Sequence, residues 1–307
     1  MSKQLVLMDH DGGVDDYLAT MLLLTMDHIE LLGIVVTPAD CYIQPAVSAT
    51  RKILDLMEFS HIPVAESTVR GINPFPHLYR RDSFIVDHLP ILNQSEFINT
   101  PLVAETGQDF MVRVLREAPA PVTLMVTGPL TTVATALDKA PDIEGKIAKI
   151  VWMGGALNVG GNVEKSLEPG QDGSAEWNVY WDAVSAARVL QTQIEIIMCP
   201  LDLTNNVPVT SDLVYKMGRQ RHYPISDLAG QCYALVIPQD YYFWDVLATA
   251  YLGHPEFYQL REWEIEIITT GLSQGRTKVV AGERKVYAMD KVNKDAFYAY
   301  ILQQWAR

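Results

Sequence analysis

The first forty residues alternate between two spacings of hydrophobic side chains. An apolar run at residues 5–8 predicts a strand, and Gly12 and Gly13 break the chain shortly after it. Between residues 15 and 26 the apolar positions recur at the spacing of one helix face, and residues 31–36 form another apolar run, rich in Ile and Val. A strand, a glycine turn, a helix and a strand in this order predict a parallel βαβ unit.

The same alternation returns in the middle of the chain. Strands are expected at residues 122–126, 147–153 and 194–198, and helices at residues 130–137 and 182–190. Repeated βα units predict an α/β fold with an open, mostly parallel, twisted sheet and helices on both of its faces. After about residue 211 the chain is expected to add helices and a late strand at residues 263–268.

Two segments lack this periodicity. Residues 71–101 are rich in proline and aromatic residues, and residues 154–173 are rich in glycine. Loops of this length usually have a function or are disordered, and side chains such as Phe75, His77 and Tyr79 favour a function for the first. Because no linker or internal repeat divides the chain, we expect one domain over residues 1–307.

The chain is acidic, with a formal net charge of −13 and a pI near 4.9. An acidic surface repels phosphate groups, which argues against non-specific binding to nucleic acid. No apolar run is long enough to span a membrane, and residues 1–5 lead into the first strand without the apolar core of a signal peptide. The chain has three cysteines, which lie far apart in sequence: Cys41, Cys199 and Cys232. We therefore expect neither a disulfide framework nor a zinc site. A cytoplasmic location is the corresponding expectation.

The strongest local signal is the acidic octet at residues 9–16, DHDGGVDD, which holds four carboxylates directly after the first predicted strand. In an open α/β sheet, ligands bind at the carboxyl ends of the strands. Asp15 and Asp16 begin the predicted helix, whose N-terminus stabilises negative charge. Four neighbouring carboxylates still repel each other, and a hard divalent cation with oxygen ligands, calcium or magnesium rather than zinc, would resolve that repulsion.

Further ligands must come from elsewhere in the chain. Asp11 and Asp16 alone cannot complete a calcium shell of about six to eight oxygens. We expect a second acidic strand end to contribute, and the best candidate is Asp245, the last residue of the run YYFWD. On the sequence alone, a helix N-cap beside aromatic core residues is an equally good interpretation of Asp245.

Four short motifs occur in a fixed order along the chain. They are the octet at residues 9–16, VTGPLT at residues 126–131, MGGA at residues 153–156 and AEWN at residues 175–178. Together they resemble the DxDxGxDD, TGPLTN-type, MGGA and AEFN or AEWN motifs of the inosine-uridine nucleoside hydrolase family. The resemblance implies a calcium-dependent hydrolase, a glycosidase that cuts the N-glycosidic bond of ribonucleosides to give free base and ribose.

The resemblance also implies a role for each matching residue. Calcium would be bound by Asp11, Asp16, Asp245 and the carbonyl of Thr127, and Asp11 would be the general base for the water that the metal holds. The ribose would be bound by Asp15, Met153, Asn162, Glu176 and Asn178, with Asp9 in a supporting position. Carboxylates around the sugar would stabilise the positive charge that develops at C1′ in the transition state.

At two positions the chain departs from the broad family. Many members carry a His just before the last metal Asp, where it can protonate the leaving base, but this chain carries Trp244; a usual Asn is here Asp40. Both departures resemble the purine-preferring inosine-adenosine-guanosine branch, in which a Trp usually stands at the position of Tyr79. We therefore expect purine ribonucleosides as substrates, in purine salvage, with the base stacked between Trp244 and Tyr79 and contacted by Asp40. His10 and His77 remain alternative acids for the leaving base.

Other functions stay open. A phosphohydrolase of the haloacid dehalogenase type would use Asp9 as nucleophile with magnesium, but it does not explain AEWN or the pair Trp244 and Asp245. A calcium- and ribose-binding protein would need no base at Asp11, and within the enzyme class a broad or pyrimidine-preferring hydrolase is the main alternative. We expect a homo-oligomer, either a dimer or a tetramer.

Overall fold

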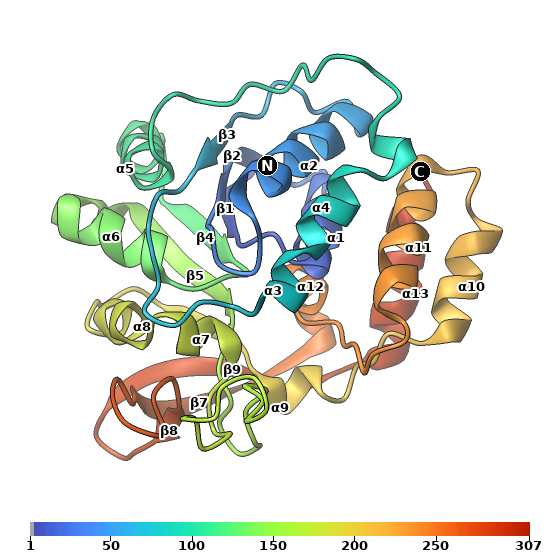
Figure 1. Cartoon of the computed structure of the whole chain (residues 1–307). Helices are drawn as coiled ribbons and strands as arrows, with labels where there is room; N and C mark the ends of the chain where they lie inside the picture. Colours follow the sequence, from blue (N-terminus) through green and yellow to red (C-terminus); the bar gives the residue numbers. More distant parts are fainter. Residues whose placement is uncertain (1–2) are drawn as a thin grey trace.

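The computed structural model describes residues 3–307, in which nine strands form the central sheet (Figure 1). The strands are β1 (Gln4–His10), β2 (Ile29–Val36), β3 (Val64–Glu66), β4 (Val122–Val126), β5 (Ile147–Met153), β6 (Ile196–Cys199), β7 (Tyr258–Ile267), β8 (Thr277–Val279) and β9 (Arg284–Val292). Their order is β3-β2-β1-β4-β5-β6-β9-β7-β8. Neighbours from β3 to β9 are parallel, whereas β7 is antiparallel to both β9 and β8. The predicted open, mostly parallel sheet is confirmed.

Helices cover both faces of this sheet. On one face lie α5 (Gly107–Glu117), α6 (Thr131–Lys139) and α8 (Ala183–Leu190) (Figure 1). The other face carries α1 (Val14–Leu24), α2 (Ile43–Leu56), α11 (Pro224–Val236), α12 (Asp245–Gly253) and α13 (Lys294–Trp305), with α10 (Ser211–Arg219) outside them. Shorter elements are α3 (His77–Arg80), α4 (Asp82–Asp87), α7 (Trp177–Trp181), α9 (Leu201–Thr204), and the 3₁₀ turns η1 (Pro90–Leu92), η2 (Pro141–Lys146) and η3 (Pro255–Phe257).

Strand β1 shows why the apolar runs are nearly continuous. Successive side chains of a strand point to opposite faces, so Val6 and Met8 join the core under α1 and α12, whereas Leu5 and Leu7 join the core under α5 and α6. A strand that is covered on both faces needs apolar residues at nearly every position between its ends. The carboxyl ends of such strands are then the first places where the chain can present polar groups.

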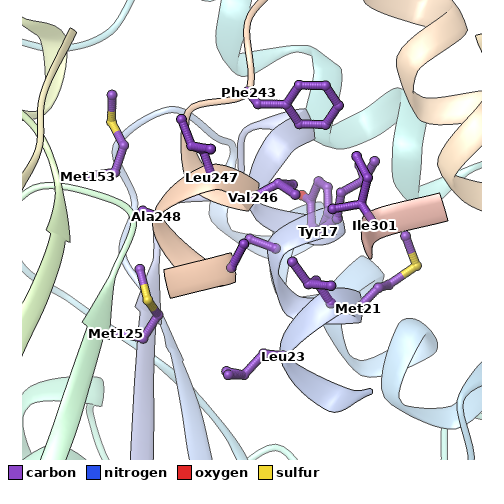
Figure 2. Close-up of a cluster of buried hydrophobic side chains, with 14 of the residues drawn as sticks. Tyr17, Met21, Leu23, Met125, Met153, Phe243, Val246, Leu247, Ala248 and Ile301 are labelled. Carbon is purple, nitrogen blue, oxygen red and sulfur yellow. The ribbon is translucent and has the colours of Figure 1, made fainter. Parts of the chain in front are cut away.

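Helices α1 and α12 pack against each other although they lie more than 200 residues apart. Figure 2 shows Tyr17 and Met21 of α1 facing Val246 of α12, with Ile301 of α13 beside them. Tyr17, Met21, Val246 and Ile301 are fully buried. This packing brings the N-termini of α1 and α12 together at the carboxyl edge of the sheet.

Several elements differ from the expectations. Residues 71–101 are not a featureless loop, since they contain α3, α4 and η1, whereas residues 154–173 contain no helix or strand. The late strand β7 begins at Tyr258 and pairs antiparallel with β9, a strand that was not predicted. Asp245 is not at a strand end; it is the first residue of α12. Over residues 3–307, no helix is both long and apolar enough to cross a membrane.

Candidate active site

The strand order reverses between β1 and β4, which makes this pair the switch point of the sheet. From β1 the chain moves through α1 to β2, and from β4 it moves through α6 to β5 on the other side. Open α/β sheets bind ligands in the crevice outside the strand ends at such a point. A cavity of about 260 Å³ opens here, with Asp11 following β1 and Thr127 following β4.

This cavity brings together every residue for which the sequence suggested a metal, ribose or base contact: Asp11, Asp15, Asp16, Asp40, Tyr79, Thr127, Met153, Asn162, Glu176, Asn178, Trp244 and Asp245. It also has walls that sequence reasoning missed: Gly13, Val14, Phe75, Asp82, Glu164, Trp177, Asn205, Gln239, Asp240, Tyr241 and Tyr242. Several of these stand beside a recognised residue in the chain. Glu164 lies two positions after Asn162, and Tyr242 two positions before Trp244. The sequence signal that could have identified these residues was their position next to a motif residue.

Asp16 joins the ends of β1 and β4. Its Oδ1 accepts a hydrogen bond from the Thr127 hydroxyl at 2.5 Å, and its Oδ2 accepts one from the Gly13 amide at 2.8 Å. A Cβ on Gly128 would lie 2.7 Å from the Cβ of Asp11, so only glycine lets these two turns approach so closely. The result is a carboxylate cluster built on the backbone of two strand ends.

The electrostatics of this cluster favour a cation. Burial raises the pKa of both Asp11 and Asp245 well above the ordinary range, and the charge of Asp16 raises each further. Nine of the lining residues are acidic and none is Lys, Arg or His. A buried carboxylate without a positive partner is costly, so either protons or a metal ion must neutralise these groups.

The donor set fits a hard divalent ion. Asp11 Oδ2 is buried and has no hydrogen-bond partner, and the metal ligands suggested beside it, two carboxylates and a backbone carbonyl, all offer oxygens. In residues 3–307, no three Asp, Glu, His or Cys side chains are already arranged as a metal shell. Both oxygens of Asp16 accept hydrogen bonds from protein donors. Asp11, Asp16, Asp245 and the Thr127 carbonyl are the groups that could hold calcium.

Asp15 fastens the two helices at the site. Its Oδ2 accepts hydrogen bonds from the amides of Trp244 at 2.9 Å and Asp245 at 2.6 Å, and its Oδ1 accepts one from the Tyr233 hydroxyl at 3.1 Å. Asp15 therefore caps α12 from the first turn of α1, where the partial positive charge of the α12 N-terminus stabilises it. Burial nevertheless raises the pKa of Asp15 to about 7.

The AEWN motif links the ends of β4 and β5. The Asn178 side chain donates to the carbonyls of Thr127 at 2.9 Å and Met153 at 3.1 Å. Glu176 accepts hydrogen bonds from the amides of Asn178 and Gly155, both at 2.9 Å. Burial raises the pKa of Glu176 to about 7, although these amides oppose the shift. The carboxylate and amide of this motif thus lie beside the octet.

The other end of the cavity is aromatic. Trp244 is half-buried, and Tyr241 meets its ring edge-on at a centroid distance of 4.5 Å. Asp40 Oδ1 and the Trp244 indole nitrogen are buried without a hydrogen-bond partner. Tyr79, from α3, donates its hydroxyl proton to Glu164 at 2.5 Å. Flat rings and acceptor oxygens are the surfaces that a heterocyclic base needs.

Three residues considered from the sequence lie outside the cavity lining. Asp9 is buried and accepts a hydrogen bond from the Thr37 hydroxyl at 2.7 Å, which argues against a phosphohydrolase nucleophile at this position. His10 is buried against Thr50, and burial lowers its pKa. His77 is exposed and bonds to the Tyr42 hydroxyl. Neither histidine is placed to protonate a base in this cavity.

The chain is similar in sequence to ribonucleoside hydrolases, but the matched part covers different fractions of each protein. A pyrimidine-specific ribonucleoside hydrolase RihA from Klebsiella pneumoniae is 27% identical over 98% of both chains. The enzyme of the same name from Salmonella arizonae is 31% identical over 68% of this chain. That second match spans only 64% of the relative's own length.

Solved structures resemble the whole chain. An inosine-uridine preferring nucleoside hydrolase from Bacillus anthracis shares 44% identity and a TM-score of 0.95, with 99% of both chains covered. A purine-preferring ribonucleoside hydrolase from Gardnerella vaginalis shares the fold, with 22% identity, a TM-score of 0.80, and 99% of this chain and 98% of that one covered. The family model described as inosine-uridine preferring nucleoside hydrolase matches residues 6–299. The chain belongs to this nucleoside hydrolase family.

Proposed function

We propose that the protein hydrolyses the N-glycosidic bond of purine ribonucleosides, in a calcium-dependent reaction that gives free base and ribose. The observation that carries this proposal is the single cavity that joins an acidic end, at the octet, to an aromatic end, at Trp244 and Tyr79. A ribonucleoside has the same two halves. Its sugar offers hydroxyls to carboxylates, and its base offers two flat faces to aromatic rings.

At the acidic end, Asp11 accepts a proton from the water that attacks C1′. Its buried, unpartnered Oδ2 suits a group that takes up a proton during the reaction. Calcium, when bound by Asp11, Asp16, Asp245 and the Thr127 carbonyl, supplies positive charge that lowers the pKa of water and orients the substrate.

The ribose lies among the carboxylates and amides of both motifs. The ribose hydroxyls are held by four polar residues of the cavity wall, and Met153 packs near the sugar: Asp15, Asn162, Glu176 and Asn178. As the glycosidic bond lengthens, positive charge grows on C1′ and the ring oxygen, and fixed negative groups stabilise it more than they stabilise the substrate. A deoxyribose would leave buried polar groups unpaired, so ribose is preferred.

At the aromatic end, Trp244 and Tyr79 stack on the purine and Asp40 contacts its edge. The bond electrons move onto the base, which leaves more readily once its N7 is protonated. No Lys, Arg or His lines the cavity, and in this proposal the proton comes from solvent while stacking makes the ring nitrogen more basic. Purine salvage, a cytoplasmic location and a dimeric or tetrameric state remain predictions.

A pyrimidine-preferring hydrolase is the second candidate, because the relatives from Klebsiella pneumoniae and Salmonella arizonae carry that specificity in their names. The two candidates are separated by release of free base from inosine, adenosine, guanosine, uridine and cytidine, each with and without a calcium chelator. We expect the highest kcat/KM with a purine and loss of activity with chelator. Higher kcat/KM for uridine or cytidine would support the second candidate, and no base release from any nucleoside would refute both.

A further inference from the structure

The carboxylate of Glu164 joins two aromatic side chains that come from different segments of the cavity wall. Its Oε1 accepts a hydrogen bond from the Tyr79 hydroxyl at 2.5 Å, and its Oε2 accepts one from the Trp177 indole nitrogen at 3.2 Å. Tyr79 belongs to α3 in the proline-rich segment, Trp177 begins α7, and Glu164 lies in the glycine-rich loop. All three residues line the cavity.

The two aromatic partners of Glu164 differ in how firmly they are held. Trp177 is 5% exposed, stacks on Phe75 at a centroid distance of 5.0 Å, and donates its backbone amide proton to Asn162 at 3.1 Å. Tyr79 is half-buried and meets Trp177 only edge-on, at 6.0 Å and 83°. The hydrogen bond to Glu164 is therefore the main polar restraint on the Tyr79 side chain.

We propose that Glu164 is a positioning residue for base recognition, which holds the ring of Tyr79 as a wall of the base end without touching the substrate. This rests on the proposed function, in which Tyr79 stacks on the base. Through one carboxylate, the proline-rich segment is tied to the loop that carries Asn162.

Without this contact, Tyr79 must be ordered by the substrate itself at each binding event. Ordering one side chain weakens binding by roughly 2- to 12-fold. The loss should fall on KM and only for substrates whose base Tyr79 stacks on, because Glu164 is absent from the acidic end where bond cleavage is catalysed. A purely structural role of Glu164 would instead affect every substrate alike.

The test compares Glu164→Ala, Tyr79→Phe and the double variant on inosine and on p-nitrophenyl riboside, whose leaving group lacks the purine face. Each single variant should raise the KM for inosine by about 2- to 12-fold. The double variant should be no worse than the worse single one, since both remove the same hydrogen bond. Glu164→Gln should restore most of the loss, because its amide oxygen accepts from the indole and its amide nitrogen donates to the phenol oxygen.

The same loop offers a matched control. Glu168 accepts a hydrogen bond from the Tyr180 hydroxyl at 3.2 Å, and neither residue lines the cavity. Glu168→Ala should leave the KM for inosine unchanged. The proposal is overturned if Glu164→Ala leaves that KM unchanged, if it raises KM equally for both substrates, or if its effect adds to that of Tyr79→Phe.

A second readout does not depend on activity. In the ligand-free protein, amide exchange over residues 77–81 should become faster in Glu164→Ala and in Tyr79→Phe, but not in Glu168→Ala. Unchanged amide exchange in Glu164→Ala and Tyr79→Phe would overturn the claim that the hydrogen bond to Glu164 restrains α3. If the wild-type protein released no base from any nucleoside while exchange changed as expected, the proposed function would fail and the tie would stand.

Discussion

The two ends of the cavity are built in different ways. At the acidic end, Asp11, Asp16 and Asp245 are 4%, 1% and 7% exposed and follow directly from a strand end or a helix N-terminus. At the aromatic end, Tyr79 and Trp244 are half-buried, and the surrounding wall comes largely from long connections. The first end is held by the sheet, and the second by side-chain contacts between loops.

This difference teaches where function can vary within one fold. Bond cleavage at a sugar needs charges at fixed positions, and strand ends provide them with little freedom. Recognition of a base depends on which rings and acceptors the loops present, so it can change while the sheet stays the same. The inosine-uridine, purine-preferring and pyrimidine-specific names of the similar proteins agree with such a division.

Substitution of Asp11 should have the largest effect on activity, because this residue is both the proposed general base and a proposed metal ligand. Asp11→Ala removes the general base, for which losses of about 10²–10⁴-fold are typical, and a metal ligand in addition. We expect kcat for inosine to fall by several orders of magnitude. Asp9→Asn, in the same octet but outside the cavity lining, should cost far less. An Asp11→Ala enzyme within about tenfold of wild type would contradict the base assignment.

Removal of calcium should come next. A calcium ion in the proposed role would contribute several kcal/mol to charge stabilisation, so dialysis against a chelator should lower activity by at least about 100-fold, with recovery on adding calcium. Calcium at 100 times its Kd should also raise the free energy of unfolding by about 2.7 kcal/mol, measured as a higher melting temperature. If neither activity nor melting temperature responds, the acidic end works without a divalent ion.

Trp244→Ala should separate the two ends. Stacking on a base is worth about 1–3 kcal/mol, and if stacking gains this much in the transition state, kcat for inosine should fall by about 5- to 150-fold. The effect on p-nitrophenyl riboside should be much smaller, because its leaving group needs no proton. Tyr79→Ala should follow the same pattern more weakly. Equal losses on both substrates would mean that Trp244 only positions Asp245, which follows it in the chain.

The smallest effect concerns the stability of the metal-free protein as a function of pH. The pKa of Glu176 is about 7 in the fold against an ordinary 4.5, so its protonated form is favoured by folding. Its stabilising contribution is complete below pH 4.5 and is lost as pH rises through 7. Glu176→Gln cannot ionise, so its melting temperature should fall less over this range, where 1 kcal/mol corresponds to about 2–4 °C. If the melting temperatures of Glu176→Gln and wild type fell in parallel over this pH range, the raised pKa of Glu176 would be refuted.

The sequence predicted best what depends on local patterns. Strands β4 and β5 have the bounds expected from their apolar runs, because strands that are covered on both faces are apolar at most positions. The candidate site residues were identified from motifs, and all of them line one cavity. Asp245 was misplaced on a strand end, since a short aromatic run before a helix has the same composition as a strand.

What the sequence could not predict depends on contacts between distant segments. The antiparallel pairing of β7 with β9 is set by tertiary packing, and neither run reveals its partner. Glu164 reads as an ordinary surface acid until Tyr79, 85 positions away, is found against it. Likewise, no local pattern indicates that Asp15 caps α12.

That cap has a consequence for how the protein comes into being. Asp15 leaves the ribosome early, while the amides of Trp244 and Asp245 that donate to its carboxylate follow 229 and 230 residues later. Until α12 has been synthesised, the octet holds several acids with neither the α12 N-terminus nor a finished cavity to stabilise them. Contacts of such long sequence separation are slow to form. The catalytic centre should therefore mature late in translation, and chains that stop before residue 245 should be inactive even where β1, β4 and β5 have already paired.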